Sequence, residues 1–495
     1  MSDRGMVAAG HQLTAEAGAR TLREGGNAVD AAVAAVLTSW VCEPLLTGPG
    51  AGGYMLVAGG GEEPTLLDFF IAAPGRGADP ATRGDLLAAE CSFGDAMQVF
   101  HVGAASCGVY GMPAGLAAAL ERWGSIDAAV LAAPAAALAR AGVPLNAAQG
   151  YVSEILEPIL VSTAESRREF APDGRVLRDG DLFHSAELGD TIERFGADGA
   201  APFYTGDLAA AVTDWVGPRG GQLTGADLAA YEAVPRAPVH ATYRGRDVLT
   251  NPPPSAGGTL IALALARLDE RSGAGPPSLE DLVAVMAEAQ DERTPEFLAG
   301  LAEPGFAERF LAGRLGSTTH ISVLDGEGRA CSVTCTNGEG SGLVVPGTGI
   351  HVNNVMGEQD LNPLGFFTFA PGRRMPSMMA PTVVLAPDGA VELVVGSAGS
   401  NRIRSAILQV VVGVVDHGLH ARDAVLAPRA HYEDGVVYAE PGIDEDALRA
   451  AGHPVVAFRA RNLFFGGVQA VERDRDSGAL SGAGDPRRGG AALAA

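Results

Sequence analysis

The stretch GSTTHISVLDGEGRACSVTCT, which begins at Gly316, constrains the fold most strongly. Two runs of alternating residues flank a glycine-containing turn, and this pattern predicts a β-hairpin that starts next to Thr318. If the connection is the five residues 325–329, Thr336 falls opposite Thr318. A four-residue connection would place Cys335 there instead. The sequence alone leaves this register open.

The position of Thr318 after a small Gly-Ser pair has a chemical interpretation. A threonine hydroxyl is a weak nucleophile unless a base lies beside it. If the chain is cut directly before Thr318, the new α-amine, with a pKa of about 8, supplies that base. Such a cut needs a small preceding residue in a flexible loop, and Ser317 fits this need. The competing interpretation is an ordinary hairpin with threonine on its solvent face.

The composition excludes several classes of function. A net charge of −24 argues against a nucleic-acid partner, because phosphate binding needs clustered cations. All 35 basic residues are arginine, which excludes Schiff-base chemistry on lysine, the usual pyridoxal phosphate anchor and a Walker-type phosphate lysine. We therefore expect no cofactor of these kinds.

The five cysteines are odd in number, scattered and without metal-ligand spacing, so we expect a reducing compartment and no metal site. The N-terminal stretch has no signal-peptide pattern, and no apolar run is long enough to cross a membrane. We expect a soluble, cytoplasmic protein that does not bind membranes.

The pattern along the chain predicts sheets covered by helices. Two helices are expected near the N-terminus, separated by a left-handed turn at Gly26-Asn27. The stretch 108–269 is interpreted as mostly helical, and short alternating strands follow Thr318. A long apolar helix after Asn401 is expected to be buried between layers. The length of 495 residues allows two to four domains or one large layered domain.

Motifs in a shared order along nearly the whole chain are similar to those of γ-glutamyltranspeptidases, which are N-terminal-nucleophile hydrolases. No single motif is decisive, but their order is highly specific. The matching segments are GGNAVDAAVAA, EP…TGPGAGGY, GMPAGL, FYTGDLA, GGQLTGADLAAYE, NPPPSAGG, STTHISVLD, VPGTGIHVNN, GSAGSNRI, LQVVVGVVDHGL, APRAHY and GDPRRGGAA.

The resemblance implies a four-layer αββα fold, with two stacked antiparallel sheets between helical layers. It also implies self-cleavage between Ser317 and Thr318, which would give a heterodimer of a large subunit, 1–317, and a small subunit, 318–495. Together these form one αββα domain. Thr318 carries over as the nucleophile and Thr336 as its hydrogen-bonding support.

The turn Gly399-Ser400 matches the oxyanion-hole glycine pair of the family. Ser400 replaces the second glycine, which is tolerable because backbone N–H groups stabilise the oxyanion. An N-cap role for Ser400 in the following helix is compatible with this assignment.

The substrate shell departs from the family pattern. Phe70 stands where the family has the arginine that grips the substrate's α-carboxylate, and Ile71 replaces a glutamate. Val355 and Glu358 stand in the segment that holds the α-amine, and only Glu358 keeps a carboxylate. Losing an arginine–carboxylate contact leaves a buried charge unpaired, so the changes favour a rebuilt pocket.

Further residues of this shell follow from the same comparison. One serine of a family pair survives as Ser377, whereas Met378 replaces the other. Asn337 is expected to contact the substrate. Arg373 and Arg374 could supply a displaced carboxylate clamp, or could belong to a solvated basic turn. His351 replaces an apolar residue and is interpreted as structural, with substrate contact as the alternative.

Three hypotheses about function follow. The first is a self-processing threonine hydrolase that cleaves a C–C bond beside a keto-acid and releases oxalate, as implied by the divergent branch in lincosamide, hormaomycin and pyrrolobenzodiazepine biosynthesis. The second is γ-glutamyl transfer or hydrolysis with a relocated clamp, such as Arg76 or Arg373, or another amide acylase. The third is a non-catalytic binding protein. In each case the partner is a small molecule.

Overall fold

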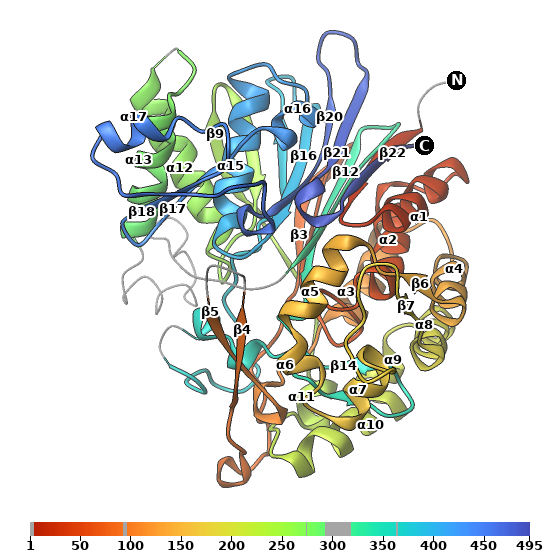
Figure 1. The fold of residues 1–495 in the computed structure, drawn as a ribbon. Coiled ribbons are helices and arrows are strands. Elements are labelled where there is room, and N and C mark those ends of the chain that lie inside the picture. The colour runs from red at the N-terminus through yellow and green to blue at the C-terminus, as the bar shows by residue number, and fades with distance from the viewer. Residues whose placement is uncertain (1–3, 93–96, 274, 293–317, 363–364) are drawn as a thin grey trace.

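The predicted hairpin lies at the centre of the larger of two sheets. Strand β11 (Thr319–Asp325) pairs antiparallel with β12 (Arg329–Thr336) in a register that joins Thr319 to Cys335 and Leu324 to Ala330. One residue further, this register places Thr336 opposite Thr318, so the five-residue connection is the correct one. The computed structural model describes residues 4–92, 97–273, 275–292, 318–362 and 365–495 (Figure 1).

The larger sheet interleaves segments from both ends of the chain. Its seven strands run in the order β22-β1-β11-β12-β2-β3-β8, and every printed pairing is antiparallel. The other strands of this sheet are β1 (Gly5–Ala9), β2 (Gly52–Gly59), β3 (Glu62–Phe69), β8 (Val234–Arg236) and β22 (Ala491–Ala494).

The second sheet stacks on the first. Its order is β21-β20-β16-β15-β10-β9, again with antiparallel neighbours, and β16 and β20 contact β11 of the larger sheet. Its strands are β9 (Val239–Tyr243), β10 (Arg246–Thr250), β15 (Thr382–Leu385), β16 (Val391–Ala398), β20 (Gly467–Arg473) and β21 (Leu480–Gly484).

The interface between the sheets holds a polar group within an apolar core. His320 Nδ1 lies 2.7 Å from Thr334 Oγ1, and its Nε2 lies 3.0 Å from Ser322 Oγ. Burial lowers the pKa of His320 to about 3, so the ring is neutral and these contacts do not require a counter-charge. The ring also lies against Gly396 of β16, where a Cβ would come within 2.2 Å of it.

Two N-terminal helices cover the outer face of the larger sheet. Helices α1 (Gln12–Arg23) and α2 (Ala28–Cys42) pack on each other and on β1, β11 and β12. Every residue of α2 is buried, which matches its small and apolar composition. A capping box formed by Asn27 and Asp30 starts α2.

The turn before α2 differs from the prediction. Gly25 has φ +98°, whereas Asn27 is extended and uses its side chain as the N-cap. The residue with positive φ therefore lies one position before the expected Gly26-Asn27 pair, because Asn27 is needed as a helix cap.

Helices also cover the outer face of the second sheet. Helix α15 (Arg402–Val415) packs on β16 and β20, and α12 (Gly257–Ser272) packs on β9 and α15. The order helix–sheet–sheet–helix confirms the predicted αββα architecture (Figure 1). The long apolar helix after Asn401 is buried on most of its surface, as expected.

The remaining segments form helices and short strands around these layers. The stretch 108–269 is not wholly helical, because β8, β9 and β10 lie within it. The other helices are α3 (Met112–Trp123), α4 (Ala128–Ala141), α5 (Ala147–Ile155), α6 (Glu157–Leu160), α7 (Ala164–Phe170), α8 (Ala186–Asp198), α9 (Ala201–Tyr204), α10 (Asp207–Val216), α11 (Gly225–Ala229), α13 (Leu279–Asp291), α16 (Ala421–Leu426) and α17 (Glu445–Ala450). The other strands are β4 (Leu87–Ser92), β5 (Met97–Val102), β6 (Val143–Pro144), β7 (Leu182–Phe183), β13 (Val344–Val345), β14 (Ile350–His351), β17 (Ala430–Glu433), β18 (Val436–Ala439) and β19 (Val455–Ala457).

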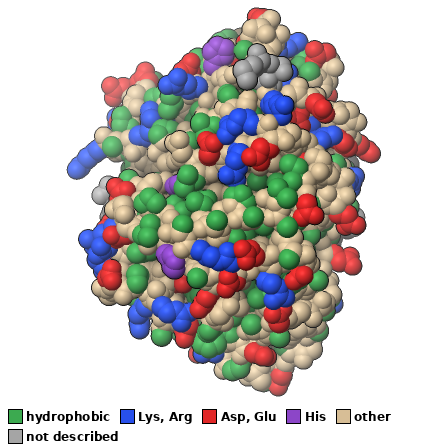
Figure 2. All heavy atoms as spheres, turned by 90° about the vertical axis from the view of Figure 1, so that its right-hand side faces the viewer, with side chains coloured by type: hydrophobic (Ala, Val, Ile, Leu, Met, Phe, Trp, Pro, Cys, Tyr) green, Lys and Arg blue, Asp and Glu red, His purple; other side chains and the backbone are tan. Residues whose placement is uncertain are grey.

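One face of the molecule mixes both signs of charge. Figure 2 shows acidic and basic side chains interspersed, with hydrophobic side chains gathered across the middle of that face. Ion pairs such as that of Arg140 on α4 with Glu193 on α8 join neighbouring helices at the surface. Exposed pairs of this kind contribute little stability, so the core dominates.

We expect Asp30→Ala to lower the free energy of unfolding by about 3 kcal/mol, measured by urea denaturation. The buried Asp30 carboxylate accepts bonds from the backbone N–H groups of Asn27, Ser125 and Ile126 and from the Ser125 hydroxyl. Asp127→Ala removes a single N-cap bond of α4 and serves as the control, with an expected loss of about 1 kcal/mol. Equal losses in the two variants would contradict this account.

Candidate active site

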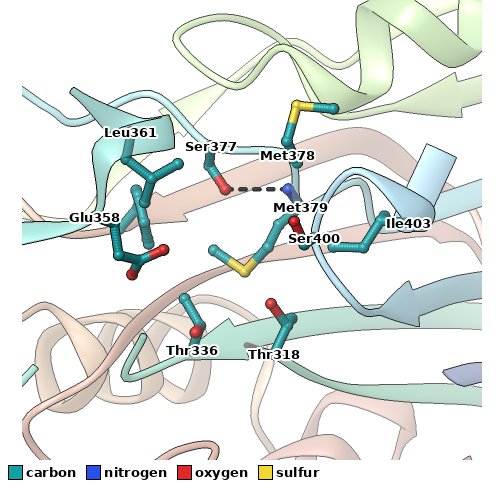
Figure 3. A pocket seen from close by; sticks show the side chains of 10 residues that line it. Thr318, Thr336, Glu358, Leu361, Ser377, Met378, Met379, Ser400 and Ile403 are labelled. Carbon is teal, nitrogen blue, oxygen red and sulfur yellow. Dashed lines mark hydrogen bonds between the residues drawn. The ribbon is translucent and has the colours of Figure 1, made fainter. Parts of the chain in front are cut away.

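A small pocket opens where the two sheets meet at the start of β11. It encloses about 240 Å³ of space, part of it open to solvent. Figure 3 shows the side chains of Thr318 and Thr336 next to each other on one wall of this pocket. Both are buried, with 2% and 4% of their surfaces exposed. The residues that line it are Phe70, Thr318, Thr336, Glu358, Leu361, Ser377, Met378, Met379, Ser400 and Ile403.

Close backbone packing fixes the strand ends that carry the two threonines. Gly53 of β2 pairs with Cys335, and a Cβ at Gly53 would lie 2.5 Å from the carbonyl oxygen of Thr334. Gly53 of the TGPGAGGY segment therefore serves close packing of β2 against β12. Thr336 Oγ1 accepts a 2.9 Å bond from the Gly338 N–H, which holds the end of β12.

The predicted oxyanion turn lies between β16 and α15, with Ser400 in the pocket wall. Gly399 and Ser400 both have positive φ, +109° and +67°, so neither has the backbone conformation of the helix that begins at Arg402. A Cβ at Gly399 would lie 2.7 Å from Gly466 Cα, so this position requires glycine. The Ser400 hydroxyl is buried with no hydrogen-bond partner among the described residues. Asn401 donates to Glu433 and anchors the turn from behind.

Phe70 forms an apolar wall with an ionic cluster behind it. Its ring stacks on Tyr54 at 5.5 Å, and its backbone oxygen accepts a 2.8 Å bond from Arg374. Arg374 and Arg236 both pair with the buried Asp68, at 3.1 and 2.7 Å. The guanidinium groups of Arg374 and Arg236 therefore already have Asp68 as their ion-pair partner. Among the described residues, the pocket lining contains no arginine.

The extended segment 377–379 carries alternating side chains to opposite sides. Figure 3 shows the Met379 thioether in the middle of the pocket, whereas Met378 points away from the two threonines. The Ser377 hydroxyl accepts a 3.0 Å bond from the Met379 N–H. Asn251 and Ser255 bind the Met379 carbonyl oxygen at 2.7 and 2.8 Å and fix the segment.

A carboxylate closes the other end of the pocket. Glu358 follows a short 3₁₀ turn and is buried beside Gly338, where a Cβ would lie 2.4 Å from Glu358 Oε1. Asn354 supports the same corner, because its amide oxygen accepts a 2.9 Å bond from the Glu339 N–H. The described lining therefore combines four hydroxyl groups and one carboxylate with five apolar side chains.

Several residues predicted to bind substrate do not line the pocket. Asn337 is buried and donates to the His351 carbonyl oxygen at 3.2 Å. Val355 is buried in the core, and Arg373 is exposed at the surface. His351 accepts a bond from the Gly342 N–H, and burial lowers its pKa to about 4, which fits the structural interpretation. Ser317 lies outside the described residues.

The pocket also contains residues that sequence reasoning missed. Met379, Leu361 and Ile403 line it. Only Met379 had a usable signal, since side chains two positions apart in an extended segment share a side. Ser377 thus implied that Met379 lines the pocket in addition to Met378.

One group among the described residues has a spacing that a metal ion could bridge. It consists of the exposed His420, the buried Glu472 and the half-buried Asp474. Exposed acidic groups of this kind are common without a metal, and this one is separate from the residues of the pocket. The pocket itself offers one carboxylate, too few for a metal site of ordinary coordination.

The stacked antiparallel sheets between helical layers define the class of N-terminal-nucleophile hydrolase folds. The solved cephalosporin acylase from Bacillus halodurans shares this fold, with a TM-score of 0.84, 26% identity and coverage of 99% of this chain and 96% of that chain. The structure of LmbA2991HD also shares it, with a TM-score of 0.82, 23% identity and coverage of 99% and 98%.

The family is shown by sequence as well. The model of the gamma-glutamyltranspeptidase family matches residues 14–308 and 305–495, and the chain belongs to this family. The glutathione hydrolase proenzyme of Escherichia coli is 32% identical over 543 residues, which cover 98% of this chain and 90% of that protein. The Acylase ACY 1 proenzyme of a Pseudomonas species is 31% identical over 520 residues, which cover 97% and 91%. Within the described parts of the chain, no helix has the length and apolarity that crossing a membrane requires.

We expect Ser400→Gly and Ser400→Ala both to retain self-processing, because the backbone N–H at this position is kept in each. The glycine variant should be about 1 kcal/mol more stable than the alanine variant in urea denaturation, since φ is +67°. Processing is read as chain length on a denaturing gel. Loss of processing in both variants would show that the Ser400 hydroxyl, and not the N–H, is required.

Proposed function

We propose that this chain is a self-processing N-terminal-threonine hydrolase whose pocket accepts a non-glutamyl substrate. Processing would divide it into residues 1–317 and 318–495, which remain together as a heterodimer. The observation that carries the proposal is the pocket itself: Thr318 and Thr336 share one wall, and the described lining has a phenylalanine where the family has its carboxylate-binding arginine.

The chemistry of processing follows from the position of Thr318. Its hydroxyl oxygen attacks the carbonyl carbon of Ser317, the C–N bond breaks, and the acyl group moves to the threonine oxygen. Water then hydrolyses the ester and leaves a free α-amine on Thr318. The same amine accepts the hydroxyl proton when a substrate is attacked. Support comes from the relatives, several of which are named as proenzymes.

We further propose that the bond cleaved is a C–C bond beside a keto-acid, with oxalate as a product. Attack of Thr318 on a ketone gives the same tetrahedral oxyanion as attack on an amide, so the Gly399-Ser400 turn would stabilise either. The carbon that leaves takes the bonding electron pair and must be protonated. The ester left on Thr318 is then hydrolysed. The Phe70 and Met379 side chains suit an apolar substrate body and not a free glutamyl carboxylate.

An amide acylase is the second candidate. It is favoured by the similarity to the Acylase ACY 1 proenzyme and to the cephalosporin acylase, which together span nearly the whole chain. γ-Glutamyl transfer would need a relocated clamp, but Arg76 and Arg373 are both exposed and lie outside the lining. A non-catalytic protein would remain one uncut chain.

We expect Thr318→Ala to purify as a single chain of 50.4 kDa, whereas the wild type gives two fragments. N-terminal sequencing of the wild-type small fragment should begin Thr-Thr-His-Ile. Thr318→Ser is the matched control, because it keeps a hydroxyl and should still be processed. A small fragment that begins at Thr319 would identify a different nucleophile, and an uncut wild-type chain would contradict every catalytic proposal made here.

We expect γ-glutamyl-p-nitroanilide to be hydrolysed at least about 10²-fold more slowly than by the Escherichia coli relative, since a buried unpaired carboxylate costs about 3 kcal/mol. Phe70→Arg combined with Met379→Ser should raise this activity by restoring a cation and removing the thioether. Release of p-nitroaniline is the measurement. Wild-type turnover equal to that of the relative would show that the pocket accepts glutamyl groups.

The C–C cleavage has its own test. Purified wild-type protein incubated with a ring-opened, pyrroline-type keto-acid should release oxalate as the long-wavelength absorbance of the substrate declines. Thr318→Ala should release none. Equal oxalate release by both proteins would exclude Thr318 as its source, whereas cleavage of a cephalosporin-type amide without oxalate release would favour the acylase.

A further inference from the structure

A buried carboxylate lies directly behind the start of β11. Glu43 ends helix α2 and is 1% exposed. Its Oε1 accepts a 2.7 Å bond from the hydroxyl of Thr319, the residue after the candidate nucleophile. Its Oε2 accepts a weaker 3.3 Å bond from Thr14. Because side chains alternate along a strand, Thr318 faces the pocket while Thr319 faces this carboxylate.

The backbone around Glu43 is shaped to admit the carboxylate. A Cβ at Gly10 would lie 2.2 Å from Glu43 Oε1 and 2.8 Å from Thr319 Oγ1. Any side chain at position 10 would therefore displace the Glu43–Thr319 bond. The close approach of Gly10 indicates a built site and not a chance contact.

A cation faces the carboxylate from the side of the oxyanion turn. Arg488, at the end of the 3₁₀ helix η8 (Pro486–Arg488), attracts Glu43 electrostatically. Its guanidinium also lies behind the oxyanion turn, where a Cβ at Gly399 would be 3.3 Å from Arg488 Nη2. Glu43 and Arg488 thus place opposite charges behind the nucleophile strand and the oxyanion turn.

The other titratable groups near Glu43 are neutral. Burial raises the pKa of Cys42 well above its usual range and that of Cys335 to about 12. Burial also lowers the pKa of His11, which follows Gly10. Burial raises the pKa of Glu43 itself to about 7, against the opposing effects of its two threonine bonds and of Arg488. Among the described residues, Arg488 is therefore the charged group that acts on Glu43, and Arg488 itself is repelled by Arg402 and attracted by Asp485. With a pKa of about 7, Glu43 is mostly ionised near pH 8, where the amine titrates.

We propose that Glu43 is a positioning residue that fixes the α-amine of Thr318 through Thr319, and that its charge, opposed by that of Arg488, sets the basicity of this amine. The inference rests on the proposed function, because the free amine exists only after cleavage before Thr318. The Glu43 carboxylate accepts a bond from Thr319, the residue next to Thr318, so its electric field acts on the Thr318 amine at short range. A negative charge stabilises the protonated amine and a positive charge destabilises it.

The sign of each effect makes the proposal testable. Glu43→Gln keeps an oxygen that can accept the Thr319 bond but removes the negative charge. The acid limb of the pH–rate profile should then move to lower pH by about half a unit or more. Arg488→Gln removes the positive charge and should move the same limb to higher pH. Thr319→Val keeps both charges but loses the bond, so the rate should fall about tenfold with little movement of the limb.

The measurement uses p-nitrophenyl acetate, a probe that needs neither a glutamyl group nor a keto-acid. The processed enzyme and each variant are assayed from pH 5 to 9, with Thr318→Ala subtracted as background, and acetylation of the 318–495 chain is confirmed by mass. In this step the Thr318 oxygen takes the acetyl group, its proton passes to the amine, and p-nitrophenolate leaves.

Opposite shifts in Glu43→Gln and Arg488→Gln would support the proposal. A limb that stays in place in either variant, or that moves the same way in both, would overturn it. If Glu43→Gln fails to fold, the direction of the shift in Arg488→Gln decides, because Arg488 is half-buried whereas Glu43 is only 1% exposed. An uncut wild-type chain would instead refute the proposed function, and the two failures are distinguishable by mass.

Discussion

The pairing of β11 with β12 is the constraint on which the site depends. Its register places Thr336 opposite Thr318, and a shift by one residue would bring Cys335 there and turn every side chain to the other face. Both neighbours of this hairpin help to hold the register. Strand β1 pairs along β11, and β2 approaches β12 so closely that Gly53 cannot carry a side chain. The pocket is thus built on the most constrained part of the larger sheet.

The two sheets contribute different functions to the site. The larger sheet supplies the threonines, whereas the second sheet and α15 supply the turn at Gly399-Ser400. Their relative position depends on the layer between them, where the neutral ring of His320 bonds within the hairpin and fills the space above Gly396. A rigid interface of this kind suits a reaction in which donors must already face the developing oxyanion.

The layered fold could be predicted from sequence because it depends on patterns that are local or long. The hairpin alternates over its whole length, α2 is apolar on all sides, and the motif order covers nearly the entire chain. The five short strands β6 to β10 were missed, since strands of two to five residues have little periodic signal.

The site was predicted in part. Residues on regular strands or in fixed turns, such as Thr318, Thr336 and Ser400, fall in the pocket wall. Val355 and Arg373 were less secure, because they lie outside regular strands and helices longer than a turn, where side-chain directions depend on tertiary contacts. Glu43 begins the matching segment EP…TGPGAGGY, but the sequence did not indicate its contact with Thr319, because the two residues are 276 positions apart.

The strand order has a consequence for the two pieces of a chain cut before Thr318. In the larger sheet, β1 from the first piece lies between β22 and β11 from the second, and in the other sheet β10 pairs with β15 across the same division. The two pieces could separate only if the hydrogen bonds between their strands were broken in both sheets. The fold must therefore be complete before the cut, and once cut and denatured, the protein could regain its structure only by a bimolecular encounter. The break in the backbone would turn an ordinary folding equilibrium into a concentration-dependent one.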